Sequence, residues 1–135
     1  MPITYTVDRK RRLLEVTYSG RISKQEIIDH RLRMDIDPRG VSGFDALVDA
    51  ESSSVQLSAA EVRELALYVR RYPYPASRRA IVTSSLVEYG QWRLFETLAD
   101  GGPRQYRVFQ SIADARAWLG IDASRHAGES QQPSR

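Results

Sequence analysis

Four times in the chain, a serine followed three residues later by an acid stands just before an apolar pattern of helical spacing. The four pairs are Ser23 and Glu26, Ser58 and Glu61, Ser85 and Glu88, and Ser111 and Asp114. In such a capping box the serine oxygen accepts a hydrogen bond from a free backbone N–H of the first turn, and the acid reaches back to the cap. The sequence therefore predicts four helices that begin at these four serines.

The segments between these helices have the patterns of strands. Apolar residues alternate with polar ones in residues 3–8 and 13–20, and the charged run "RKRR" at 9–12 is typical of a solvated turn between them. Short apolar runs follow at 44–50, 79–84 and 105–110. The resulting order, ββαβαβαβα, predicts an α/β fold with a single mixed sheet: an antiparallel N-terminal hairpin, parallel central strands at 44–50 and 79–84, and four covering helices.

Helical spacing also indicates which residues face the core. In the first helix we expect Ile27, Ile28, Leu32 and the stem of Arg31 on the buried side, which turns His30 toward water. In the second helix Val62, Leu65, Ala66 and Val69 form the clearest amphipathic stripe of the chain, and Gly120 is expected to end the fourth helix. We expect one domain over 1–121, followed by a disordered polar tail over 122–135.

Charge and composition narrow the functional classes. The chain has 135 residues, no cysteine, and a net charge of only +3 from 20 basic and 17 acidic residues. Its arginines occur as scattered doublets rather than a stripe, so nucleic-acid binding is not expected. No signal peptide or membrane-spanning run is apparent, and the absence of cysteine is compatible with a reducing compartment, so we expect a cytoplasmic protein.

A ligand of such a sheet is expected beyond the carboxyl ends of the strands, where helix N-termini gather. The candidate residues at that rim are Asp49, Ser52, Ser53, Ser54, Ser84 and Ser85, with the three consecutive serines expected in a loop. Ser58 begins the second helix nearby. For Ser58 and Ser85, capping alone is a sufficient explanation, and each cap stabilises by about 1 kcal/mol.

Tyr89 and Arg93 are further candidates because an arginine near the start of a helix opposes the helix dipole. Either a carboxylate such as Asp49 or an anionic ligand could hold Arg93, and the alternative is an exposed side chain whose stem covers its neighbours. Tyrosines 68, 72, 74 and 89 could supply amphipathic walls for a ligand, although aromatic residues at helical spacing more often belong to a core.

The residues do not favour an enzyme, and no catalytic residue, metal site or cofactor is assigned. A serine hydrolase needs a histidine beside its serine, and only His30 and His126 exist. No phosphate-binding glycine loop and no two-histidine metal spacing is present. A carboxylate-based activity around Asp45, Asp49 and Glu51 stays open, although solvated carboxylates are the commoner explanation.

Over residues 3–120 the order of elements resembles bacterial STAS-like proteins related to the anti-sigma factor antagonists. The segments that carry the resemblance are "LVDA", "LSAAEVRELA", "AIVTSSLVEYGQWRLFE" and "VFQSIADARAWLG". The resemblance implies a fold of the STAS and CRAL-TRIO type. In the antagonists, a serine near the second helix lies in an aspartate, serine, serine, glycine motif and is phosphorylated by a partner kinase. Here "DAESSSVQLSAAE" lacks that motif, although Ser58 and the serines at 52–54 lie nearest to it.

Two functions therefore stay open at this point. One is a non-catalytic regulatory module, resembling STAS domains, that binds a protein partner or itself. The other is a carrier or sensor of a small anionic or amphipathic, lipid-like ligand at the carboxyl ends of the central strands. The sequence names neither the partner nor the ligand.

Overall fold

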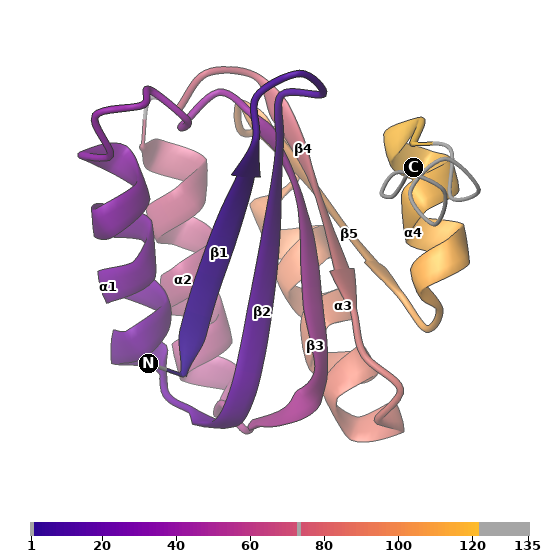
Figure 1. Ribbon diagram of the computed structural model, residues 1–135. Helices are drawn as coiled ribbons and strands as arrows, with labels where there is room; N and C mark the ends of the chain where they lie inside the picture. The colour runs from indigo at the N-terminus through magenta and orange to yellow at the C-terminus, as the bar shows by residue number, and fades with distance from the viewer. Residues whose placement is uncertain (1, 73, 122–135) are drawn as a thin grey trace.

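The computed structural model describes residues 2–72 and 74–121, which form one five-stranded sheet with four helices (Figure 1). The predicted 122–135 tail lies outside the described residues. The elements follow the expected ββαβαβαβα order: β1 Ile3–Asp8, β2 Leu13–Ile22, α1 Lys24–Asp35, β3 Asp45–Val55, α2 Ala59–Arg71, β4 Ser77–Val82, α3 Leu86–Ala99, β5 Arg104–Phe109 and α4 Ile112–Leu119.

The strands lie in the sheet in the same order as in the chain, β1-β2-β3-β4-β5. The β1-β2 hairpin is antiparallel, and the three pairs that follow are parallel. The mixed sheet expected from the apolar patterns is therefore confirmed. In β4 and β5, which are in register, Arg79 lies beside Tyr106.

The third strand is longer than predicted. It continues to Val55, and Ser52, Ser53 and Ser54 pair with 19–21 of β2 after a register shift. The expectation that these serines lie in a loop is therefore wrong. The pairing partner accounts for the difference, because β2 also extends past its apolar stretch to Ile22 and offers backbone hydrogen bonds that no side-chain pattern reveals.

The four predicted caps are all present. Ser23, Ser58 and Ser85 each accept a hydrogen bond from the backbone N–H three residues on, and Ser111 does the same for Asp114. Only the first two are full capping boxes, in which Glu26 and Glu61 also reach back to the cap. Gly120 adopts the left-handed conformation and ends α4, as expected. No helix in the described part of the chain is long and apolar enough to cross a membrane.

The helices divide into two layers. α1, α2 and α3 cover one face of the sheet, and α4 lies on the other (Figure 1). Alternation along β4 sends Ile81 toward the three-helix side and Ala80 and Val82 toward α4. The larger core cluster is therefore between the sheet and α1–α3.

The buried side of α1 differs from the prediction. Its buried residues are Ile27, His30, Arg31 and Met34, whereas Leu32 is exposed. These four have the spacing i, i+3, i+4 and i+7 of a core stripe, but two of them are polar. His30 is only 3% exposed, so the expectation that it faces water is wrong.

Candidate functional site

Three arginines from three different elements are buried on the α1–α3 side of the sheet. Arg31 lies on α1, Arg79 on β4, and Arg104 at the start of β5; their exposed fractions are 7%, 3% and 2%. Alternation explains how the strands bury them, because Arg79 shares a face with Ile81, and Arg104 shares one with Tyr106. We call this group the arginine cluster.

The arginine cluster has no ion-pairing carboxylate among the described residues. Within 2–72 and 74–121, no carboxylate forms an ion pair with any of its three guanidinium groups. Asp35 at the end of α1 feels their positive charge, but burial outweighs that effect and raises its pKa. Removing a charge from water costs several kcal/mol unless a partner compensates it, so the cluster is an unusual feature for a domain of this size.

Many hydrogen-bond donors of the cluster are also unused. Nε and Nη1 of both Arg31 and Arg104, and Nε of Arg79, are buried without a hydrogen-bond partner. The contacts that exist are with neutral groups: Arg104 Nη2 donates to the Ser42 carbonyl at 2.7 Å, and Arg79 Nη2 lies 4.0 Å from the Met34 sulfur. Buried polar atoms are normally satisfied, so these donors indicate a missing acceptor.

Aromatic rings supply part of the compensation. The Arg104 guanidinium carbon lies 3.5 Å from the centre of the Tyr74 ring, and that of Arg31 lies 5.4 Å from the centre of the Tyr106 ring. Cation–π contacts of this kind stabilise by about 0.5–2 kcal/mol each. That is less than the cost of burying a full charge, so the rings hold the guanidinium groups without neutralising them.

The ionisation of neighbouring groups reflects a positive potential. Burial, followed by the charges of Arg79 and Arg31, lowers the pKa of His30 to about 3. Burial and the charge of Arg104 lower the pKa of Arg79 to about 9, which still leaves it charged at neutral pH. Burial alone would raise the pKa of Tyr106, but the three arginines outweigh it and lower that pKa below its usual range.

An internal cavity lies against the cluster. Its enclosed volume is about 20 Å³, which is room for about one water molecule. Its polar lining is formed by His30, Arg31 and Arg79, and the remaining walls are Tyr18, Ile27, Met34, Val48, Leu65, Ile81, Trp92, Phe95 and Tyr106. We call it the arginine cavity. Because its polar groups are chiefly cations and N–H or O–H donors, it is suited to a small anion.

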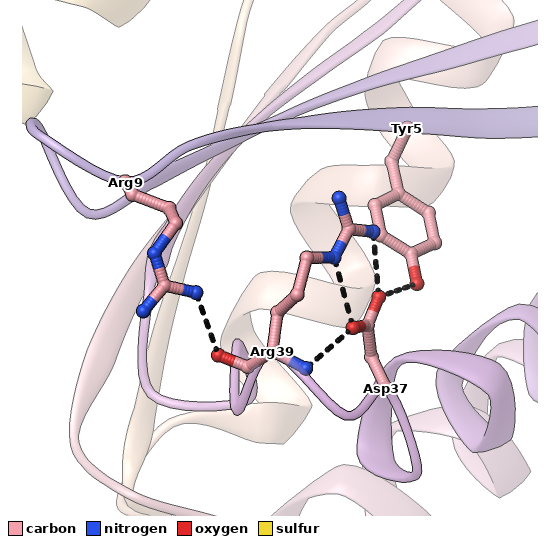
Figure 2. Close-up of polar contacts among 4 residues, drawn as sticks. All are labelled: Tyr5, Arg9, Asp37 and Arg39. Carbon is pink, nitrogen blue, oxygen red and sulfur yellow. Dashed lines mark hydrogen bonds and ion pairs between the residues drawn. The ribbon is translucent and has the colours of Figure 1, made fainter.

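The loop over 36–44 contacts residues beside the cavity. Asp37 accepts a 2.6 Å hydrogen bond from Tyr5 of β1 and is also bound by the Arg39 side chain, while Arg9 donates to the Arg39 carbonyl (Figure 2). The Tyr5 ring packs edge-on against His30 with centroids 5.6 Å apart. Ser42 in the same loop receives the hydrogen bond of Arg104. This loop is therefore tied both to the β1-β2 hairpin and to the arginine cluster.

The residues that the sequence placed at the strand-end rim do not line this cavity. Asp49 is half-buried and accepts from the Glu51 backbone N–H at 3.0 Å; it borders a hollow with Glu15 and the buried Arg116 beside α4. Ser54 borders a different hollow at the start of α1. Ser53 donates to the Ala50 carbonyl at 2.9 Å, and Ser52 is exposed. These residues remain a prediction for a surface site.

The other predicted site residues have local explanations. Ser58 and Ser85 cap helices, and Ser84 is exposed. Tyr89 packs partly against the main core. Arg93 is exposed and forms an ion pair with Glu96 at 3.2 Å, one turn along α3. Of the alternatives considered for Arg93, the exposed side chain is the one observed, and its partner is Glu96 rather than Asp49.

The sequence contained signals for the arginine cluster, and of its three members only the stem of Arg31 was expected on a buried side. Arg31 follows Ile27 by four positions, the spacing of one helix face. In "RRAIV" Arg79 alternates with Ile81, and in "RQYRV" Arg104 alternates with Tyr106 and Val108. Applying the period of two to arginine as well as to apolar residues would have turned both strand arginines inward.

Comparison with known proteins establishes the class of fold. No protein-family model matches the sequence, and no curated protein matches it. Among solved structures, an uncharacterised protein of the DUF3478 family from Shewanella loihica PV-4, described as having a SpoIIAA-like fold, matches with a TM-score of 0.53 and 19% identity. The match covers 87% of this chain and 93% of that chain. This protein therefore has a SpoIIAA-like, STAS-type fold, as the resemblance implied.

Proposed function

We propose that this protein is a non-catalytic STAS-type module that binds a small anionic ligand in the arginine cavity. The observation that carries the proposal is the burial of Arg31, Arg79 and Arg104 without an ion-pairing carboxylate among the described residues. A bound anion would supply the missing charge and accept hydrogen bonds from the unused N–H groups. It is the carrier or sensor function that the sequence left open, with the ligand under α1–α3 instead of at the strand ends.

The test is the dependence of stability on anions. Thermal unfolding is followed in a zwitterionic buffer with sodium salts of chloride, sulfate, phosphate and carboxylates, at constant ionic strength. A ligand at a hundred times its dissociation constant stabilises the native state by about 2.7 kcal/mol. We expect at least one anion to raise the melting temperature of the wild-type protein and not that of Arg79→Met, which keeps an unbranched apolar stem and removes the charge.

The matched control is Arg63→Met, because Arg63 is exposed on α2. Its response to anions should equal that of the wild-type protein. If no anion stabilises the wild-type protein, or if Arg79→Met responds like Arg63→Met, the proposal is wrong.

The second candidate function is binding of a protein partner or of a second copy. The observation that favours it is the exposure of Leu86 and Val87, at 76% and 72%, directly after the rim serines Ser84 and Ser85. Adjacent exposed apolar residues at one site are typical of interaction surfaces. Sedimentation velocity tests the self-association case: Leu86→Asp with Val87→Asp should lower the sedimentation coefficient of a dimeric wild-type protein, and a monomeric wild-type protein would exclude self-association through this surface.

A further inference from the structure

The walls of the arginine cavity indicate what lies next to the anionic group in the ligand. Apart from His30, Arg31 and Arg79, the lining residues are apolar or aromatic, and they come from helices α1, α2 and α3 and from strands β2 to β5. A site for an inorganic ion would be expected to surround the ion with polar groups. Here two cations share the lining with mostly apolar side chains, so the walls fit a ligand that combines an anionic group with an apolar part.

The unused polar atoms indicate which anionic group fits. Trp92 Nε1 and the Tyr106 hydroxyl, both in the lining, are buried without hydrogen-bond partners, in addition to the free N–H groups of Arg31 and Arg79. The indole and guanidinium N–H groups only donate, whereas the Tyr106 hydroxyl and the unpartnered His30 Nδ1 can donate or accept, so a group whose oxygens accept hydrogen bonds fits these atoms. A carboxylate is such a group at neutral pH, and its two oxygens match the planar array of N–H groups on a guanidinium.

The size of the cavity limits the ligand. About 20 Å³ is enclosed, which is room for about one water molecule, so side chains of the wall must move before a carboxylate with a hydrocarbon chain can enter. The wall beside Arg79 is Met34, an unbranched and adaptable side chain whose sulfur contacts Arg79 Nη2 at 4.0 Å. A rotamer change of Met34 is the simplest way to admit a short hydrocarbon chain behind a carboxylate.

We infer that the ligand of the arginine cavity is a monocarboxylate with a short apolar chain. Its carboxylate binds Arg31 and Arg79, and its hydrocarbon packs among apolar walls such as Ile27, Leu65 and Phe95. This inference rests on the proposed function, because it names the chemical class of the anion that the arginine cluster binds.

The experiment is a calorimetric titration of the wild-type protein with acetate, propionate and butyrate, compared with chloride, sulfate and phosphate at equal ionic strength. Burying one additional CH₂ group should tighten binding roughly threefold to fourfold, so affinity should rise along the carboxylate series. Butyrate should bind at least about tenfold tighter than any of the inorganic anions, a difference of about 1.4 kcal/mol. Butyramide has nearly the same shape without the charge and should not bind.

Two variants distinguish the inference about the carboxylate from the broader proposal that the cavity binds an anion. Arg79→Met should lose butyrate binding, whereas Arg63→Met should retain it. If inorganic anions bind as tightly as butyrate, and Arg79→Met abolishes their binding, the carboxylate inference is overturned while anion binding by the cavity stands. If no anion binds, or if Arg79→Met still binds butyrate, both proposals are overturned.

Discussion

The Arg104 guanidinium carbon lies 3.5 Å from the centre of the Tyr74 ring, so a fully buried cation rests on an aromatic face. The Tyr74 hydroxyl is buried without a hydrogen-bond partner, so the ring rather than the hydroxyl makes this contact. The ring also stacks against Tyr72, with centroids 4.5 Å apart. Tyr74 therefore holds the arginine that binds the 36–44 loop through Ser42.

This relationship predicts different outcomes for two substitutions of Tyr74. Tyr74→Phe keeps the ring and should change the free energy of unfolding by less than about 1 kcal/mol, because a hydroxyl without a partner contributes little. Tyr74→Leu removes the cation–π contact as well as ring packing and should cost about 2–4 kcal/mol. Urea unfolding at neutral pH measures both. Equal losses for the two variants would contradict the assignment of the contact to the ring.

His30 predicts a dependence of stability on pH. Its pKa in the folded protein is about 3, below the ordinary value of 6.5, because it is buried beside Arg79 and Arg31. The unfolded chain therefore takes up a proton below about pH 6.5 that the folded protein does not, so stability falls as the solution becomes more acidic. The free energy of unfolding should fall by up to about 1.4 kcal/mol for each pH unit, until the pH reaches the pKa of His30 in the folded protein.

His30→Phe should remove this component, because phenylalanine keeps a ring against Tyr5 and does not titrate. Urea unfolding at pH 7.5, 5.5 and 4.5 measures the difference between the variant and the wild-type protein. That difference should shift in favour of the variant at each step toward acid. A difference that stays constant across this range would show that His30 is protonated as easily in the folded state as in the unfolded chain.

Because Met34 is part of the cavity wall, shortening its side chain should make room for a longer carboxylate. Met34→Ala removes a buried side chain next to Arg79 and should cost about 2–5 kcal/mol of stability. Hexanoate should restore part of that loss by filling the vacated space. The matched control is Leu119→Ala, a similar truncation in the α4 cluster on the opposite face of the sheet. Equal recovery of both variants with hexanoate would mean that the carboxylate binds elsewhere.

The contacts of Asp37 predict its ionisation. Hydrogen bonds from the Arg39 side chain, and then from Tyr5, hold the pKa of Asp37 well below its ordinary value (Figure 2). Arg39→Met should therefore raise that pKa more than Tyr5→Phe does. Carboxyl-carbon NMR titration of the three proteins measures this order directly. An Asp37 that titrates at its ordinary pKa in the wild-type protein would exclude these contacts in solution.

Local sequence patterns predicted the fold well because helix caps and strand alternation recur along the chain. The caps at Ser23 and Ser58 form as full capping boxes, and the alternation of β1 and β2 produces the hairpin. The extension of β3 through Ser52 to Ser54 was not predictable in this way. It depends on pairing with a strand more than thirty residues away, and serine favours loops in isolation.

The candidate site was predicted less well, for a physical reason. Sequence reasoning assumes that charged residues face water, which is the general rule, and a chain with 18 arginines offers many exposed alternatives. Arg31, Arg79 and Arg104 break that rule together, and only the assembled sheet and helices bring them to one cavity. Departures of this kind from local consistency are expected at functional sites.

The most direct measurement of the central claim is a crystal structure of the protein grown in sodium bromide, with bromide located by its anomalous scattering. The account predicts an ordered bromide between the guanidinium groups of Arg31 and Arg79, displaced when butyrate is added. The contradicting result is a cavity that holds only water, with bromide confined to exposed arginines such as Arg63.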